Sequence, residues 1–94
     1  MAERRAVVGS KVGLHARPAA LFVRAAARQP VKVTIAKGGR DPVDAASILA
    51  VLALDVRGGE EVVLAAGGDG AEQALDELVA VVEADHDAPA GGSG

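Results

Sequence analysis

The 94-residue chain contains no cysteine, no tryptophan and no tyrosine, and Phe22 is its only aromatic residue. Without cysteine the chain has no disulfide, no thiolate metal site and no cysteine nucleophile. Its ten lysines and arginines are scattered among thirteen acidic residues, which gives a formal net charge of −3. Because a nucleic-acid surface needs a basic stripe or aromatic platforms for the bases, we expect no nucleic-acid partner.

Long apolar segments are also lacking. No run approaches the ~20 residues that a membrane-spanning helix needs, and the first ten residues have no apolar stretch of the signal-peptide kind. We therefore expect a soluble, cytoplasmic protein without membrane insertion. The length indicates one domain, which we assign to residues 1–85. Residues 86–94 are rich in glycine and include proline and serine, so a disordered tail is expected there.

Apolar periodicity predicts four strands. Alternation of apolar and polar residues is typical of a half-buried strand, and it is clearest in the segment VKVTIA. A brief third strand is expected near Arg40 to Val43, at the turn KGGR, and Pro42 restricts it to a sheet edge or to a very short length. The four strands are expected at residues 4–9, 31–36, 40–43 and 61–66.

Three segments favour helices. Apolar residues at i, i+3, i+4 and i+7 follow a helix start near Ala16, and Pro30 ends that segment. Residues 46–54 are rich in alanine and leucine, which favours a short second helix. The third helix is expected after Asp69, its predicted N-cap, because Glu72 follows at the spacing of a capping box.

The element order is therefore β-α-β-β-α-β-α, which predicts an α+β fold. The strands should form a four-stranded, mainly antiparallel sheet, and their alternating pattern indicates that one face is buried. The three helices are expected to cover that face and to leave the opposite face open to water.

His15 stands at the predicted start of the first helix, in the N-cap position. Histidine is not a preferred N-cap residue, and a broken local rule often marks a functional position. Pro18 fits the first turn, where its missing N–H is no loss. The amides of Ala16 and Arg17 lack intrahelical partners, and the helix dipole and the Arg17 guanidinium add positive charge. Together these groups predict an anion site centred on an imidazole.

The reaction that uses every part of this site is phosphoryl transfer through a phosphohistidine, since a neutral imidazole is a nucleophile. The alternative is a surface histidine beside a solvated arginine. Metal binding is disfavoured because the only other histidine, His86, lies in the predicted tail, and no cofactor is expected. A serine hydrolase is also disfavoured, because none of the serines has the context of a nucleophile elbow: Ser10, Ser47 and Ser93.

The segment GLHARPAA, residues 13–20, resembles the active-site signature of the HPr family, the histidine-containing phosphocarriers of the bacterial phosphoenolpyruvate:sugar phosphotransferase system. Residues 44–54 resemble the regulatory-serine helix of that family, and residues 58–64 resemble its following turn and strand. The resemblance covers roughly residues 3 to 85. The positions that match the signature are Gly13, Leu14, His15, Arg17 and Pro18.

The resemblance implies the open-faced β-sandwich of the family and a phosphocarrier function. Enzyme I would transfer a phosphoryl group to Nδ1 of His15, and His15 would pass it to IIA proteins or domains of sugar permeases. Arg17 would steady the phosphoryl group in both complexes. Such a protein is a covalent carrier rather than an enzyme, and we expect a monomer.

An HPr-like regulatory phosphorelay module is the alternative function. Such a module, with nitrogen-related partners or with transcription-regulator or kinase partners, would carry the same motif without a link to sugar uptake. The regulatory relative that lacks the histidine is disfavoured, because His15 is present.

The resemblance also aligns Ser47 with the regulatory serine that HPr kinase/phosphorylase modifies. Asp44 and Ala46 replace the asparagine and lysine found there in many family members, so the alternative is an ordinary helix-start serine. Partner docking would involve Ile48, Leu49, Leu52 and Arg24. Core packing is the alternative for the three apolar residues, and solvation is the alternative for the arginine. Because so short a helix cannot bury every side, at least one of the three should be exposed.

Overall fold

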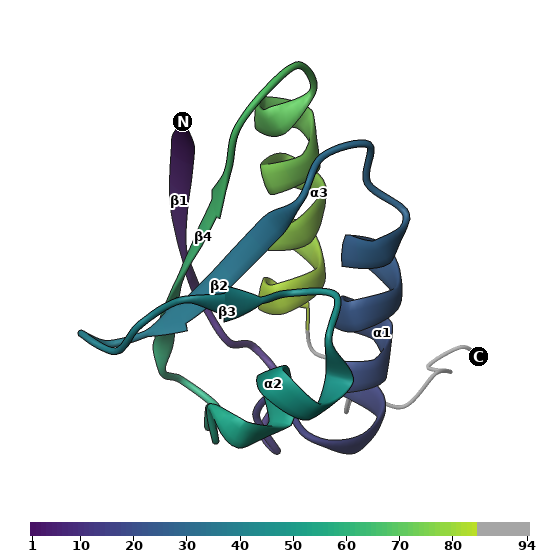
Figure 1. The fold of residues 1–94 in the computed structure, drawn as a ribbon. Helices are drawn as coiled ribbons and strands as arrows, with labels where there is room; N and C mark the ends of the chain where they lie inside the picture. The colour runs from purple at the N-terminus through teal and green to yellow at the C-terminus, as the bar shows by residue number, and fades with distance from the viewer. Residues whose placement is uncertain (85–94) are drawn as a thin grey trace.

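The computed structural model describes residues 1–84, so the tail predicted at 86–94 lies outside the described residues. Within the described residues the elements follow the predicted order (Figure 1). They are β1 (Ala2–Val7), α1 (Ala16–Ala27), β2 (Val33–Lys37), β3 (Val43–Asp44), α2 (Ile48–Ala53), β4 (Glu61–Ala66) and α3 (Ala71–Glu83).

The strands form one antiparallel sheet in the order β1-β4-β2-β3. In the middle of β4, Leu64 lies opposite Arg4 of β1 and opposite Ile35 of β2. Because side chains alternate across a strand, Leu64 and Ile35 face the core together with Val62 and Val33, and all four are buried. The predicted α+β fold with an antiparallel sheet is confirmed.

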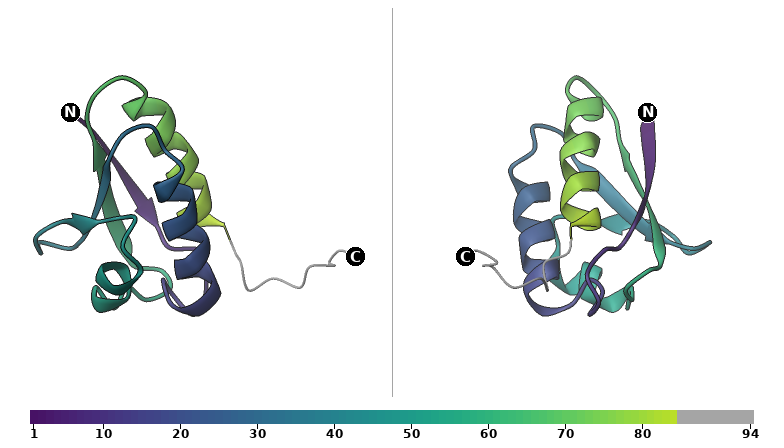
Figure 2. Two further views of the ribbon diagram at one scale, coloured as in Figure 1. Left: turned by 45° about the vertical axis from the view of Figure 1, so that its right-hand side comes forward. Right: turned by 180° about the vertical axis from the view of Figure 1, so that it is seen from behind.

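The two long helices, α1 and α3, lie side by side across one face of the sheet (Figures 1 and 2). Phe22 of α1 and Leu75 and Leu78 of α3 are completely buried beneath them. The shorter α2 lies at one end of the molecule, where it contacts α1 and β3. On the opposite face of the sheet, residues such as Val63 and Ala65 are only half-buried. The chain is therefore an open-faced sandwich.

Four elements besides α3 have boundaries that differ from the sequence predictions. β2 contains Val33–Lys37 rather than residues 31–36. β1 begins and ends two residues before the predicted range 4–9, because its pairing with β4 runs from Ala2 to Val7. β3 contains only Val43 and Asp44, directly after Pro42, which has no N–H to donate to a neighbouring strand. α2 begins at Ile48 rather than at residue 46, because Ser47 is its N-cap.

The predicted capping box at the start of α3 is wrong. The helix begins at Ala71, one residue later than a cap at Asp69 requires, and the N-cap residue is Gly70. Gly70 has a φ of 92°, in the left-handed region that glycine enters easily, and α3 has no side-chain cap. The Glu72 carboxylate forms an ion pair with the Arg4 guanidinium of β1 instead of reaching back to the cap. Glu72 therefore contacts the sheet and does not take part in a capping box.

Among residues 1–84, no helix is both long enough and apolar enough to cross a membrane.

Candidate functional site

The first helix begins as the sequence predicts, with His15 as its N-cap residue. The backbone of His15 is extended, with φ −130° and ψ 161°, and its side chain makes no capping hydrogen bond. The first backbone hydrogen bond of α1 is long, at 3.4 Å from the Ala19 amide to the His15 carbonyl oxygen. Within the described part of the chain, the amides of Ala16 and Arg17 have no hydrogen-bond acceptor. The N-terminal start of α1 is therefore open to an anion.

Ala16, the first residue of α1, has an unusual backbone conformation. Its φ is 49°, which lies in the left-handed region that alanine rarely occupies and that costs about 1–2 kcal/mol. Such strain persists only where surrounding structure holds it in place. Here the strained residue directly follows the candidate nucleophile, His15.

His15 is held in place where the loop before α1 packs against the loop after α2. The Leu14 amide donates a 2.9 Å hydrogen bond to the Val56 carbonyl oxygen, and the Leu14 side chain is buried. Gly13 lies against the same carbonyl, so closely that a Cβ at Gly13 would collide with the Val56 oxygen. Glycine at position 13 is therefore required by contact as well as by its φ of 77°. These contacts bring the segment after α2 next to His15.

Asp55 is the acidic partner of His15. The His15 Nε2 atom lies 3.3 Å from Oδ1 of Asp55, and their side chains are 39% and 55% exposed. The other carboxylate oxygen, Oδ2, lies 3.5 Å from Nη2 of Arg57. The positive charge of Arg57 lowers the pKa of Asp55 below its usual value, with smaller contributions from Lys37 and His15. Sequence analysis missed Asp55, because nothing in the local pattern connects the end of α2 with the start of α1.

Arg17 is the second residue of α1, in its first turn, and is exposed to solvent. Among residues 1–84, its guanidinium has no carboxylate partner. A long, unpaired cation beside the open amides can therefore turn toward an anion on His15. Arg24 is also exposed, two turns further along α1.

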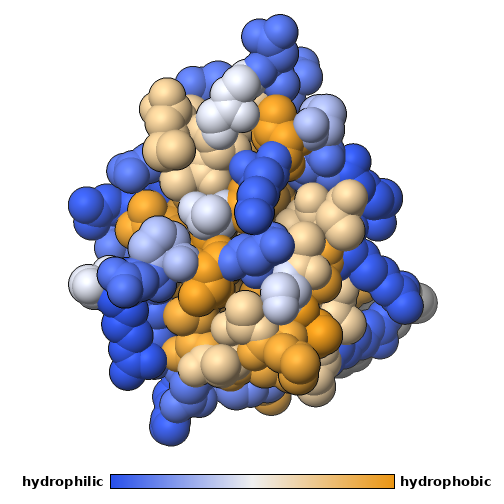
Figure 3. Space-filling model, in the orientation of Figure 1, coloured by the Kyte–Doolittle hydropathy of each residue, from blue (hydrophilic) through white to orange (hydrophobic). Residues whose placement is uncertain are grey.

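The other predicted site residues gather on α2. The Ser47 hydroxyl caps this helix by accepting a 3.3 Å hydrogen bond from the Ala50 amide. Leu49 is 77% exposed and Ile48 is 39% exposed, whereas Leu52 is half-buried against the core. Apolar side chains gather over α2 on the face shown in Figure 3. The expectation that at least one of the three apolar residues is exposed agrees with the structure.

Metal chemistry has no basis in the described residues. Within residues 1–84 no three histidine, cysteine, aspartate or glutamate side chains lie close enough together to hold a metal ion. The groups carried by the start of α1 are an imidazole, two unpaired amides and the exposed guanidinium of Arg17. This set suits a negatively charged oxygen-rich group attached to the imidazole.

Comparison with known proteins identifies the family. The family model described as the PTS HPr component phosphorylation site matches residues 2–84. The chain belongs to the HPr family. It is 60% identical to the phosphocarrier protein HPr of Streptomyces coelicolor over 82 residues, which are 87% of this chain and 88% of that protein. The HPr family assignment makes this protein a phosphocarrier of the phosphotransferase system.

A solved structure and a second relative of the HPr family are also similar to the chain. The crystal structure of the phosphocarrier protein HPr from Bacillus anthracis superposes with a TM-score of 0.81 at 40% identity, covering 86% of this chain and 95% of that one. The HPr-like protein Crh of Bacillus subtilis is 42% identical over 83 residues, which are 88% of this chain and 96% of Crh. The predicted fold and family are thus confirmed.

Proposed function

We propose that His15 is the phosphoryl acceptor of this HPr protein and that enzyme I is the donor. The observation that carries the proposal is the open start of α1, where the consecutive residues 15–17 carry an imidazole, two amides without acceptors and an unpaired arginine. A phosphoryl group is the anion whose covalent chemistry uses all of them.

The transfer is a displacement at phosphorus. The lone pair of Nδ1 of His15 attacks the phosphorus of phospho-enzyme I, and the bond between phosphorus and the donor breaks with its electron pair going to the donor. Arg17 and the amides of Ala16 and Arg17 stabilise the charge on the phosphoryl oxygens. Transfer to a IIA protein or domain repeats the displacement in reverse, so the P–Nδ1 bond breaks and its electron pair returns to the ring.

In this proposal the protein is a carrier that ends each cycle unchanged, and it does not itself convert a substrate. It is a cytoplasmic monomer that shuttles between enzyme I and the IIA components of sugar permeases. Its docking surface consists of Ile48, Leu49, Leu52 and Arg24. The exposure of Ile48 and Leu49 supports this surface, because exposed apolar side chains next to a site are typical of binding surfaces.

Ser47 is proposed as a second, regulatory phosphorylation site for HPr kinase/phosphorylase. Its hydroxyl already serves as the cap of α2, at 3.3 Å from the Ala50 amide. A phosphoryl group there would keep its negative charge at a helix start, which tolerates it. The effect would fall on docking, because the added charge of ~−1.5 to −2 stands beside Ile48 and Leu49.

The test is phosphorylation by purified enzyme I and phosphoenolpyruvate. The wild type should acquire one acid-labile phosphoryl group, and His15→Ala should acquire none. His86→Ala removes the other histidine of the chain and should be phosphorylated like the wild type. Labelling of His15→Ala at the wild-type level would overturn the assignment of His15.

A transfer assay separates the sugar branch from a regulatory branch. The second candidate is a regulatory phosphorelay role, and the 35% identity of the chain to the phosphocarrier protein NPr of Shewanella violacea over 85 residues supports it. Phosphorylated protein should lose its label to a purified IIA protein of a sugar permease. Retention of the label in the presence of sugar-permease IIA proteins would favour the regulatory role.

A further inference from the structure

Asp55 is the acidic group that faces the imidazole of His15 in the described structure. It is the first residue after Leu54, the C-cap of α2, and its Oδ1 atom lies 3.3 Å from Nε2 of His15. Nε2 is the ring nitrogen on the opposite side from the proposed nucleophile, Nδ1. The carboxylate therefore contacts the imidazole without occupying the place of the phosphoryl group.

The backbone of Asp55 provides a second observation. Its φ is 53°, a left-handed conformation that glycine adopts without cost and that aspartate tolerates better than most residues. The Asp55 amide donates to the Leu52 carbonyl oxygen at 3.1 Å, and the Lys37 ammonium donates to the Asp55 carbonyl oxygen at 2.6 Å. Since glycine would suit this turn better, the backbone does not explain the carboxylate.

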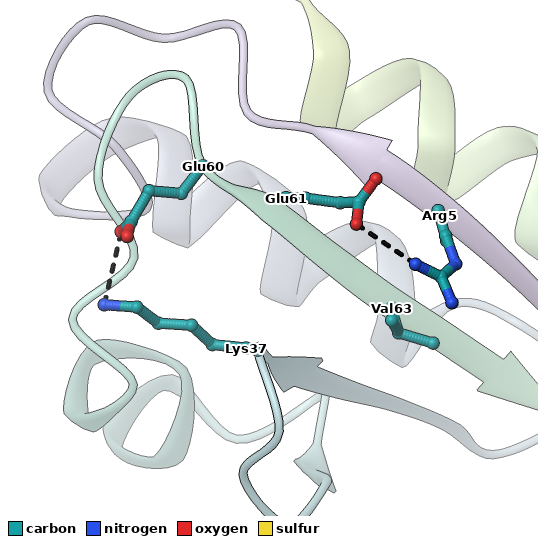
Figure 4. A pocket seen from close by; sticks show the side chains of 6 residues that line it. Arg5, Lys37, Glu60, Glu61 and Val63 are labelled. Atoms are coloured by element: carbon teal, nitrogen blue, oxygen red, sulfur yellow. Dashed lines mark hydrogen bonds and ion pairs between the residues drawn. The ribbon is translucent and has the colours of Figure 1, made fainter.

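The surrounding charges orient the carboxylate. Arg57 lies 3.5 Å from Oδ2 and lowers the pKa of Asp55, so the group is ionised at neutral pH. Lys37 also pairs with Glu60 at 3.2 Å (Figure 4), which anchors the lysine that holds the Asp55 carbonyl. Arg57 holds one oxygen of the carboxylate and leaves the other, Oδ1, facing His15.

We propose that Asp55 is a positioning residue that keeps a proton on Nε2 of His15 and thereby leaves the lone pair of Nδ1 free to attack phosphorus. A neutral imidazole carries one proton on either of its nitrogens, and a carboxylate beside one nitrogen favours the tautomer protonated there. This inference rests on the proposed phosphoryl acceptor, but its first readout does not require phosphorylation.

The proton on Nε2 stays in place throughout the reaction. When Nδ1 takes up the phosphoryl group, the ring becomes positively charged and its proton remains opposite Asp55. When the P–Nδ1 bond breaks, its electron pair returns to Nδ1 and a neutral imidazole leaves. Asp55 thus faces the positive charge that forms in the phosphorylated ring, as well as selecting the reactive tautomer.

The alternative is an ordinary surface ion pair without consequence, which is common for exposed side chains. Two variants separate the readings. Asp55→Gly removes the carboxylate and suits the left-handed backbone, so it should fold with stability close to the wild type. Asp55→Asn keeps the size and the tolerance of positive φ, and removes only the charge. Asp41→Asn, an exposed aspartate in the turn between β2 and β3, is the matched control.

Nitrogen-15 NMR of the imidazole at alkaline pH, where the ring is neutral, measures the tautomer directly. The wild type and Asp41→Asn should hold the proton mainly on Nε2, and both Asp55 variants should shift population toward Nδ1–H. Rapid-quench phosphorylation by phospho-enzyme I should slow by about tenfold in both Asp55 variants, as expected for loss of a charged hydrogen-bonding partner, and should be unchanged in Asp41→Asn.

The two readouts together decide the proposal. A shifted tautomer with slower transfer supports it. An unchanged tautomer overturns it even if transfer slows, because slower transfer alone would indicate a docking or folding effect. A shifted tautomer with an unchanged rate also overturns it, because the carboxylate then has no role in transfer. Wild-type protein that fails to accept a phosphoryl group would instead contradict the proposed function and leave the tautomer result valid.

Discussion

The starts of α1 and α2 are built in opposite ways. At α2 the Ser47 hydroxyl accepts from the Ala50 amide at 3.3 Å, and the Asp44 carboxylate accepts from the Ala46 amide at 2.9 Å. At α1 the side chain of the N-cap His15 makes no capping hydrogen bond, and the first two amides have no acceptor among residues 1–84. Where side chains accept hydrogen bonds from the first amides, the helix start has only a structural role. Where those amides have no acceptor and an arginine stands beside them, the helix start can bind an anion.

The open start also carries conformational strain. Ala16 has a φ of 49°, whereas the described residues at the start of α2 have no positive φ. Proteins often accept such a local loss of stability where function requires it. The contrast between the two helix starts therefore predicts that mutations there will separate activity from stability.

The largest expected effect is on transfer, through Arg17. Arg17→Ala should slow phosphoryl transfer from enzyme I by about 100-fold, the usual loss when one donor to a developing oxyanion is removed. Stability should change by less than about 0.5 kcal/mol, because Arg17 is exposed. Rapid-quench kinetics and urea denaturation measure the two quantities. Arg40→Ala, in an exposed turn, is the control, and equal rates in both variants would contradict the prediction.

The next effect is on stability, through the cap of α2. Ser47→Ala should lower the free energy of unfolding by about 1 kcal/mol, because it removes the acceptor of the Ala50 amide. Ser47→Asp keeps an acceptor and should stay within a few tenths of a kcal/mol of the wild type. Both variants should accept a phosphoryl group from enzyme I. Unchanged stability in Ser47→Ala would show that the cap contributes nothing.

Replacing alanine by glycine should change the free energy of unfolding in opposite directions in α1 and α2. Ala16→Gly should raise the free energy of unfolding by about 0.5 kcal/mol, because relief of the left-handed strain exceeds the added entropy of the unfolded chain. Ala50→Gly, within α2, should lower it by about 1 kcal/mol. Urea denaturation measures both. A loss of stability in both variants would mean that the backbone of Ala16 is not strained.

The smallest effect is expected at the start of α3. Asp69→Ala should change the free energy of unfolding by less than about 0.5 kcal/mol, because Gly70 is the N-cap and α3 has no side-chain cap. A loss of ~1 kcal/mol, as expected for removal of an N-cap side chain, would support the capping box that the sequence suggested. Ser47→Ala, measured in parallel, provides that reference.

The structure confirms the predictions that rest on local signals. His15 as the N-cap of α1 followed from the apolar stripe and from Pro18, and β4 at 61–66 followed from the short apolar segment EVVLAA. The predicted start of α3 is one residue too early, because Gly70 with its left-handed backbone is the N-cap and Glu72 pairs with Arg4 of β1 instead of with a cap residue. A pattern within one segment does not contain the contact of that segment with the sheet.

The sequence by itself determined the element order, the buried face of α1 and the family, because periodicity and the motif around His15 are properties of neighbouring residues. Only the tertiary structure decided which side chain meets the imidazole. Asp55 reaches His15 because Gly13 lets one loop approach the Val56 carbonyl and the Leu14 amide bonds to it. Likewise, the packing of α2 against α1 and β3 leaves Leu49 exposed and half-buries Leu52. Contacts between distant segments depend on how the backbones pack, and no local pattern encodes them.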